Sequence, residues 1–523
     1  MLMNHCSIQS TEIAAPVPLV QSRCVWIALL LWLGLAVPLF LGMPLNSDTA
    51  LYDVQTRSLM NGGVAYRDII EPNLPGVLWI HMAVRSLAGW SSEAIRSADL
   101  ILFAAILCLW MRISVPGRRS RPVFLLAAAL FYLTRNEWCH VQRDTWTLLP
   151  VGVAVILRLG RPVGPRLLAA VFEGFCWGCA FWIKPHVVIP GAAVMLIDMR
   201  GRSFYEMIVH FTAVVAGGVI AAVPGVAWLM TTGAWEHFQQ MMLEWNPEYL
   251  TAARERMSFD RWVMMARRFA PWLWIHVVAL PIAFASVRSH IRSGRTDSTR
   301  RQALLGGCYV GWLVQSVVLQ HALDYVHVPA VILGLALICS HSWQMPIVAR
   351  RSIVTGFLLC SVLWTPFFHG QRLQQWPMVL DKGSTVSVRA ILAHGNLPDW
   401  HHLGRVIEFL RQQEVSDRDV TCLNVHSVHV YRETQTLPST RYWSVSILQD
   451  LFPRRSAEIA EAVAASPHRY IITESRETRL IHQISGQSIT DGLESVFESG
   501  SYRILAVDRD EAQIAAKVQD RHN

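Results

Sequence analysis

The sequence predicts a polytopic α-helical membrane protein with an extracytoplasmic α/β domain at its C-terminal end. Three observations support this fold class. Of the 523 residues, 52% are hydrophobic and only 16% are charged, and the mean hydropathy is +0.31, which soluble enzymes of this size rarely show. Uncharged runs alternate with short arginine clusters. Beyond about residue 370, helix-like and strand-like segments alternate instead.

The first predicted span covers residues 25–43, VWIALLLWLGLAVPLFLGM. It holds no charge and is long enough to cross the roughly 30 Å of hydrocarbon as a helix. A cleaved signal peptide is the competing interpretation. However, the run is longer than the usual core of a signal peptide, and no small-x-small cleavage site follows it. We therefore expect the segment to be retained as a transmembrane helix.

Basic clusters between the apolar runs predict the orientation of the other spans. They lie at Arg112 with 118–121, and at 158–166, 200–202, 288–301 and 350–351. If all are cytoplasmic, each intervening stretch crosses the membrane an even number of times, which gives about eleven spans. The N-terminus is then cytoplasmic and the C-terminus extracytoplasmic, in a multi-pass plasma (inner) membrane protein. This orientation also explains the net charge of +8, so we expect no nucleic-acid partner.

The same count of membrane crossings also decides whether the doubtful segment at residues 75–90 spans the membrane. It is apolar but short, and His81 and Arg85 interrupt it. If it crossed the membrane, the cluster at 118–121 would lie outside. We therefore predict an amphipathic helix in the interface and a second span at 94–113, so that residues 44–95 form one extracytoplasmic loop with two interfacial helices.

Cysteine and acidic residues inside the spans suggest packing roles. Ten cysteines are scattered, mostly in apolar segments, and so indicate no disulfide framework. Cys176 and Cys179 have CxxC spacing but lie in mid-span, where small packing residues are more common than a redox or metal site. An acidic residue in a span is often functional, but we expect Glu173 to face the bundle in a structural role.

Residues 370–523 are predicted to form a separate α/β domain outside the membrane. HHLGRVIEFLRQQ carries apolar residues at helical spacing, namely Leu403, Val406, Ile407 and Leu410. The β-branched run VTCLNV then reads as a buried strand. SAEIAEAVAAS followed by RYIITE repeats this order, and RILAVDR predicts a closing strand. No acid, base or nucleophile pattern appears in the domain, so we expect it to cover or select the acceptor rather than to catalyse.

Short motifs in the outer loops carry a resemblance to a known superfamily. The first loop contains Asp48, Tyr52, the glycine pair at 62–63, AYRD at 65–68 and LPG at 74–76, and QRDTWTLLP (142–150), IKPH (183–186) and YVHVP (325–329) follow. This order resembles the GT-C glycosyltransferases, which include protein O-mannosyltransferases and the aminoarabinose transferase of lipid A. The resemblance covers about two thirds of the chain, and residues 1–369 would form the catalytic membrane domain.

The resemblance implies an inverting glycosyltransferase. Such an enzyme would move a sugar from a polyprenyl-phosphate donor to an extracytoplasmic lipid, glycan or protein acceptor, with Asp48 as the general base. Two positions depart from the usual pattern. Thr49 stands where many relatives have a second acidic residue, which argues against a metal site, and Leu74-Pro75 replaces a double proline, although one proline suffices to open a helix. No cofactor is indicated.

The chemistry can also be argued from residue types. A lipid-phosphate sugar presents its phosphate at the membrane surface, so the enzyme needs a carboxylate to deprotonate the acceptor and cations to stabilise the departing phosphate. Asp48 follows the first span at headgroup depth, and basic side chains lie at the outer ends of other spans. The substrate-binding candidates are Tyr52, Arg67, Asp68, Glu71, Arg143, Asp144, Lys184, His186 and His327; Arg135 and Asp324 lie in the same outer loops.

Each candidate also has a structural alternative. Asp48 could be a helix N-cap, Asp68 and Glu71 could solvate a loop, Arg143 could pair with Asp144, and Lys184 could extend from a span end towards water. A multi-pass transporter or an envelope-glycan ligase or polymerase would have a similar hydropathy profile. A transporter would place its polar residues near mid-membrane in matched halves, whereas here they lie in the outer loops.

Overall fold

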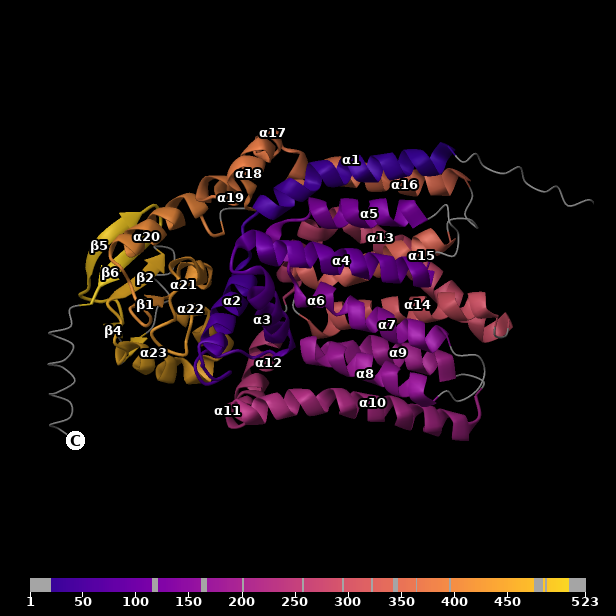
Figure 1. The fold of residues 1–523 in the computed structure, drawn as a ribbon, viewed down its shortest axis with the longest axis horizontal. Helices are drawn as coiled ribbons and strands as arrows, with labels where there is room; N and C mark the ends of the chain where they lie inside the picture. The colour runs from indigo at the N-terminus through magenta and orange to yellow at the C-terminus, as the bar shows by residue number, and fades with distance from the viewer. Residues whose placement is uncertain are drawn as a thin grey trace, which may run out of the picture.

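The computed structural model describes most of the chain. The described residues are 20–114, 121–160, 167–199, 202–255, 258–293, 296–320, 323–341, 347–363, 365–394, 397–474, 483–484 and 487–507. Several arginines of the basic clusters, among them Arg118, Arg119 and Arg295, lie outside the described residues. A bundle of helices forms the larger part of the molecule, and an α/β domain lies at one end of it (Figure 1).

Apolar helices lying roughly side by side make up the bundle (Figure 1). They are α1 (Val20–Gly42), α4 (Ser92–Ser114), α5 (Arg121–Thr134), α7 (Leu148–Leu159), α8 (Leu167–Ile183), α9 (Val188–Met199), α10 (Phe204–Thr231), α13 (Phe259–Ser293), α14 (Asp297–Val314), α15 (Val328–His341) and α16 (Ile347–Leu363). Large side chains such as Leu31, Leu168 and Val277 stay exposed, as a lipid-facing surface requires.

The helices of this bundle differ in length. In the part of the chain that the structure describes, six helices are long and apolar enough to cross a membrane, and α1 and α4 are among them. Others, such as α8 and α9, are shorter. The structure therefore confirms a bundle of membrane-spanning character, and the count of about eleven crossings stays a prediction.

Glycines allow α8 and α10 to pack at close range. A side-chain carbon on Gly174 would overlap the carbonyl oxygen of Val214, and one on Gly217 would overlap that of Val171. Small residues at such spacing let helix backbones approach in a membrane, where packing replaces the hydrophobic effect between helices. Cys176 and Cys179 lie on the same helix as free thiols, in agreement with the predicted packing role.

Glu173 is fully buried in an ionic cluster of the bundle. Its carboxylate lies 2.6 Å from the guanidinium of Arg158, which also pairs with Asp198 at 3.1 Å. Asp198 in turn pairs with Arg300 at 2.6 Å and with Arg202 at 2.9 Å. Each of these charges has an opposite partner, as burial in a medium of low dielectric demands. The cluster ties α7, α8, α9 and α14 together, and Glu173 faces the bundle, as predicted.

The loop at residues 44–95 contains the two expected helices, α2 (Ser47–Met60) and α3 (Gly76–Ala88). Both lie at the end of the bundle that faces the α/β domain (Figure 1). Pro75 precedes the first residue of α3, as the proline pattern predicts. Gly76 packs on the end of α8, where a side-chain carbon would lie 2.5 Å from the carbonyl carbon of Trp182. Glycine is therefore required at this contact.

Shorter helices complete this end of the bundle. They are the 3-10 helices η1 (Glu137–Cys139), η2 (Pro185–Val187) and η5 (Asp324–His327), the π-helices η3 (Met241–Trp245) and η4 (Gln315–Leu319), and α6 (Arg143–Trp146), α11 (Trp235–Gln240) and α12 (Asn246–Glu255). The topology predicted from the sequence also places outer loops at 135–144, 184–186, roughly 231–268 and 321–329, and most of these segments lie in them. Residues 321–322 lie outside the described part of the chain.

A helical connector joins α16 to the α/β domain. It consists of η6 (Pro366–Phe368), α17 (Gly370–Leu373), α18 (Trp376–Lys382) and α19 (Val386–Leu392). Val379 and Val388 belong to the same hydrophobic core as α1, and the indole of Trp376 donates to Gly34 O at 3.2 Å. The segment from 370 to 392 therefore packs on the bundle, and the sheet domain begins after it.

The α/β domain has the expected elements. α20 (Trp400–Gln412) buries Leu403, Val406, Ile407 and Leu410, as predicted. The main sheet has the order β1-β2-β6-β5, with β1 (Val420–Cys422) parallel to β2 (Tyr470–Glu474), and β6 (Tyr502–Ala506) antiparallel to β2 and to β5 (Glu494–Ser499). The remaining elements are η7 (Val425–Ser427), α21 (Val428–Thr434), α22 (Val445–Leu451), η8 (Pro453–Arg455), α23 (Ser456–Ala464), β3 (Gln483–Ile484) and β4 (Gln487–Ser488).

Candidate active site

A cavity of about 540 Å³ lies between the polar end of the bundle and the α/β domain. The bundle side contributes polar side chains, namely Asp48, Tyr52, Glu71, Gln142, Arg143 and Tyr325. The α/β side contributes a mostly apolar wall, namely Leu397, Val425, His426, Trp443, Ile447, Leu448 and Leu451. The cavity thus combines a charged floor with an apolar cover.

Asp48 lies in the first turn of α2 and lines the cavity. It is not the N-cap of this helix, because the side chain of Asn46 accepts from Thr49 N at 2.8 Å and fills that role. Asn46 also donates to Glu137 O at 3.1 Å and to His140 O at 3.0 Å. The start of α2 is therefore fixed to η1 without any help from Asp48, whose carboxylate is left for the cavity.

Burial changes the acidity of Asp48. Desolvation raises the pKa of its carboxyl above the ordinary value, although the nearby charge of Arg143 and a hydrogen bond with Gln142 oppose the change. A raised pKa makes the carboxylate a stronger base, closer to what proton transfer near neutral pH needs. The surroundings of Asp48 therefore suit a general base.

A strained turn places Gln142 and Arg143. Val141, which precedes them, has a backbone φ of 56°, which is rare for a β-branched residue. Asp99 in α4 holds this turn, because its carboxylate accepts from the backbone of Val141, from Trp146 Nε1 at 2.7 Å and from Tyr132 Oη at 2.8 Å. Such strain persists only where surrounding contacts impose it, and it is often found at functional sites.

Among the described residues, Arg143 is one of two arginines that line the cavity, together with Arg261. Within the described part of the chain, the guanidinium of Arg143 makes no hydrogen bond or ion pair, although it lines the cavity. Burial opposes its charge, but the neighbouring Tyr52 and Asp144 raise the pKa of Arg143 above its ordinary value. A half-buried guanidinium that has no anion at contact distance is suited to bind an anionic ligand.

Lys184 is committed to another partner. Its ammonium forms an ion pair with Asp144 and donates to Gln320 Oε1 at 2.9 Å. Asp144 therefore pairs with Lys184 rather than with its sequence neighbour Arg143, and the structural alternative of an Arg143–Asp144 ion pair is wrong. Burial lowers the pKa of Lys184 to about 8. The pair lies near Asp48, whose acidity it influences.

Glu71 and Tyr52 complete the polar floor. The carboxylate of Glu71 accepts from Asn73 N at 3.1 Å and from the amide of the Asn73 side chain, and burial raises its pKa. The ring of Tyr52 packs edge-on to His81 at 5.5 Å between centroids. Both residues line the cavity, so Glu71 is more than a solvated loop residue.

Other sequence-derived candidates do not line the cavity. Arg67 and Asp68 form a partly exposed ion pair at 2.6 Å, and Asp68 also accepts from Val64 N at 2.7 Å. His327 is buried against the ring of Phe269. Neither this histidine nor His186 is among the residues that line the cavity. The structure therefore brings together Asp48, Tyr52, Glu71 and Arg143, with the Asp144–Lys184 pair behind them.

Some residues of the site were missed by sequence reasoning. Gln142 and Tyr325 are the first residues of the motifs QRDTWTLLP and YVHVP, so their positions carried a signal. His426 and the wall of α22 carried none, because they come from the distant α/β domain. His426 Nδ1 lies 3.0 Å from Ser47 Oγ, across 379 residues of sequence. Only the folded chain shows that this domain covers the cavity.

Arg135 and Asp324 also meet at the cavity end. Asp324 lines the cavity, and its carboxylate lies 3.7 Å from Arg135, whose guanidinium stacks on the ring of Phe269. Because Arg135 is paired with Asp324, its charge is less available to a ligand than that of Arg143, for which no ion pair is found among the described residues. Among the described residues, no group of three or more metal-binding side chains is found.

Comparisons with known proteins identify the fold. No protein-family model and no curated protein matches the sequence. Two crystal structures of ArnT from Cupriavidus metallidurans do match the structure. The apo form aligns with a TM-score of 0.52 at 14% identity, over 92% of this chain and 96% of that chain. The form bound to undecaprenyl phosphate aligns with a TM-score of 0.55 at 13% identity, over 92% of this chain and 97% of that chain. This chain therefore shares the fold of these two ArnT structures over 92% of its length.

Proposed function

We propose that this chain is a membrane glycosyltransferase that moves a sugar from a polyprenyl-phosphate donor to an extracytoplasmic acceptor. The observation that carries the proposal is the pairing of Asp48 and Arg143 in one cavity: a carboxylate of raised pKa and a guanidinium without an anionic partner among the described residues. The shared fold adds support, because one of the similar ArnT structures holds undecaprenyl phosphate.

In the proposed reaction, Asp48 takes the proton of the acceptor hydroxyl. The hydroxyl oxygen then attacks the anomeric carbon from the side opposite the phosphate and forms the new glycosidic bond. The bond between the anomeric carbon and the phosphate oxygen breaks, and its electron pair leaves with polyprenyl phosphate. Arg143 balances the charge that develops on this phosphate. The anomeric configuration is inverted in a single displacement.

The other polar residues would support these two groups. Lys184 and Asp144 lie near both residues and would keep the local charge balanced when the donor phosphate arrives. Tyr52 and Glu71 line the cavity, where they can hydrogen-bond sugar hydroxyls. We propose no direct substrate contact for Arg67, Asp68, His186 or His327, because they do not line the cavity.

The location of the cavity favours transfer at the membrane surface over transport. Its polar residues come from the ends of helices and from loops at one end of the bundle, where a headgroup phosphate would lie. The α/β domain supplies an apolar wall rather than the base or the cation, which supports its predicted part in covering or selecting the acceptor. With the predicted topology, this end faces outside the cytoplasm.

A donor-hydrolysis and transfer assay tests the proposal. Purified protein in detergent would be incubated with polyprenyl-phosphate hexose and pentose donors, together with a lipid, glycan and protein extract of the cell envelope. We expect the protein to release polyprenyl phosphate and to label one acceptor class. Failure to release polyprenyl phosphate from any donor by folded, wild-type protein would reject the proposed function.

A further inference from the structure

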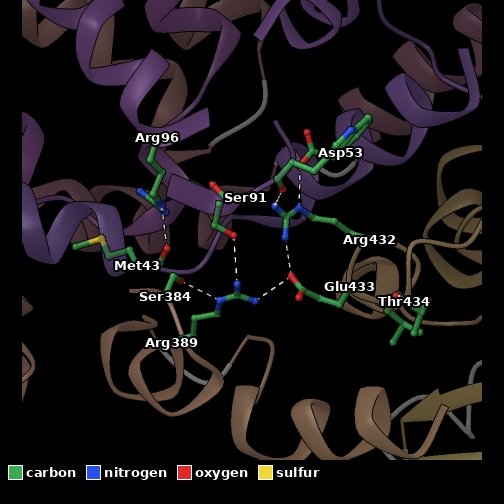
Figure 2. A network of polar contacts seen from close by, with 12 residues as sticks. Met43, Asp53, Ser91, Arg96, Ser384, Arg389, Arg432, Glu433 and Thr434 are labelled. Carbon is green, nitrogen blue, oxygen red and sulfur yellow. Dashed lines mark hydrogen bonds and ion pairs between the residues drawn. The ribbon is translucent and has the colours of Figure 1, made fainter. Parts of the chain in front are cut away.

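A second cluster of charges lies on α2, away from the cavity. At its centre is Asp53, which is only 1% exposed and does not line the cavity. Its carboxylate accepts from His81 Nδ1 at 3.1 Å and from Arg85 Nε at 2.8 Å, both in α3. The third donor is Arg432 Nε at 2.8 Å, which belongs to α21 of the α/β domain (Figure 2).

Arg432 connects Asp53 to two further segments. Its guanidinium donates to Glu433 Oε1 at 2.6 Å and to Trp90 O at 3.0 Å. Glu433 also accepts from Arg389 at 2.9 Å, and Arg389 donates to Ser384 Oγ at 2.9 Å in the connector (Figure 2). The network therefore joins α2, α3, the connector and α21 at one point.

The buried charge of Asp53 is stabilised when all of its donors, from α3 and from α21, are in place. A carboxylate removed from water needs several donors or opposite charges. Burial disfavours the charged form of Asp53, but His81, Arg432 and Arg85 together keep its pKa below the ordinary value. Since one of these three donors comes from the α/β domain, the charged cluster forms only when that domain sits on α2.

Geometry links this cluster to the cavity. Asp48 and Asp53 are five positions apart on one helix, which separates them by about 140° around the axis and about 7.5 Å along it. Asp48 therefore faces the cavity while Asp53 faces α3 and α21. The charge cluster on one face resists rotation of α2 about its axis, so the direction of Asp48 depends on the contacts of Asp53 as well as on those of Asn46.

We propose that Arg432 is a positioning residue that acts through Asp53 to fix the rotation of α2 and thereby the direction of the Asp48 carboxylate. The inference rests on the proposed function, in which Asp48 is the base. It makes the α/β domain a part of the catalytic arrangement as well as a cover. The contact between Ser47 and His426 holds the first turn of α2 to the same domain.

Steady-state kinetics of Arg432→Gln, Asp53→Asn and the double variant test the inference. A base displaced by about 1 Å costs about 10² in rate, so we expect kcat to fall by about that factor in each single variant. The KM for the donor should stay within about twofold, because Arg143 is untouched. The double variant should be no slower than the slower single variant, since both changes break one contact.

A matched control comes from the same helix. Arg57 also lies on α2 and reaches the α/β domain, at 3.4 Å from Gln435 Oε1, but it does not bond Asp53. Arg57→Gln should keep the wild-type kcat. Single variants with wild-type kcat, or losses that multiply in the double variant, would overturn the inference. Arg432→Lys keeps the charge but cannot reach Asp53, Glu433 and Trp90 together, so it should recover part of the rate.

Hydrogen exchange separates failure of this inference from failure of the proposed function. In Arg432→Gln we expect faster amide exchange along α2 than in wild type or Arg57→Gln, with the bundle helices unchanged. This result does not depend on any substrate. Unchanged exchange in α2 would overturn the positioning role even if sugar transfer is confirmed. Faster exchange in a protein that transfers no sugar would reject the proposed function alone.

Discussion

Replacing Asp48 by asparagine removes the only proton acceptor that the proposed reaction requires. The side chain keeps its size and polarity but cannot take a proton at neutral pH. The fold should tolerate the change, because Asn46 caps α2 and contacts η1 in its own right. The substitution also removes a half-buried charge, the carboxylate whose pKa desolvation has raised. We therefore expect normal expression and an unchanged or slightly higher melting temperature.

Turnover should respond very differently. A positioned general base contributes about 10² to 10⁴ in rate, which corresponds to about 3 to 5 kcal/mol of transition-state free energy. The loss should appear in kcat, while the KM for the donor changes little, because Arg143 remains in place. The assay is release of polyprenyl phosphate from a polyprenyl-phosphate sugar at equal protein levels, for wild type and for Asp48→Asn.

The pH profile gives a second measurement on the same variant. Wild-type kcat should fall as the pH drops through the pKa of Asp48, because the protonated carboxyl cannot act as a base. Since burial raises this pKa, the acid limb should lie above the ordinary range for aspartate. Asp48→Asn should lack that limb. Near-normal turnover in Asp48→Asn, or an unchanged acid limb in its residual activity, would refute the assignment of the base.

Three further outcomes follow from the structure. Arg143→Gln should lower kcat/KM for the donor by about 10² to 10³, because an electrostatic group at a developing charge is lost. Arg67→Gln should leave kcat/KM near the wild-type value. Equal losses in both variants would contradict the assignment of Arg143 to the cavity. Gly174→Leu should lower the melting temperature in detergent sharply, because its side chain would overlap the backbone of α10; a wild-type melting curve would show that this helix contact is absent. A reporter that is active only outside the cytoplasm should be active when fused after residue 523 and inactive when fused near residue 117. Reporter activity near residue 117 would show that residues 75–90 cross the membrane.

The sequence predicted the parts of this fold that have a strong local pattern. Uninterrupted apolar runs, and the helical spacing of Leu403 to Leu410, depend only on neighbouring residues, and both are confirmed. β5 was not predicted, because its sequence ESVFES alternates weakly and most of its side chains are exposed. The connector was assigned to the outer domain, since nothing in its short helices shows that Val379 and Val388 pack on the bundle.

The site shows the same limit at the level of single residues. AYRD suggested that Arg67 and Asp68 bind substrate, but a charged pair in a loop can face a cavity or water, and here the two residues pair near the surface. QRD suggested an Arg143–Asp144 pair, but Asp144 bonds Lys184 from another loop. Spacing along the chain reveals which charges exist, whereas the folded structure determines which of them neutralise one another.

The polar character of the first loop has a physical explanation in these contacts. α2 follows a transmembrane helix directly, yet Thr49, Asp53, Gln55, Thr56 and Ser58 are all buried. Lipid could not satisfy such groups, so α2 must be enclosed by protein, and α3, the bundle and α21 enclose it. Enclosure along most of the helix allows one face to hold a charge cluster and another to present Asp48 to the cavity. A polar helix at the membrane surface is therefore stable only together with the α/β domain that covers it.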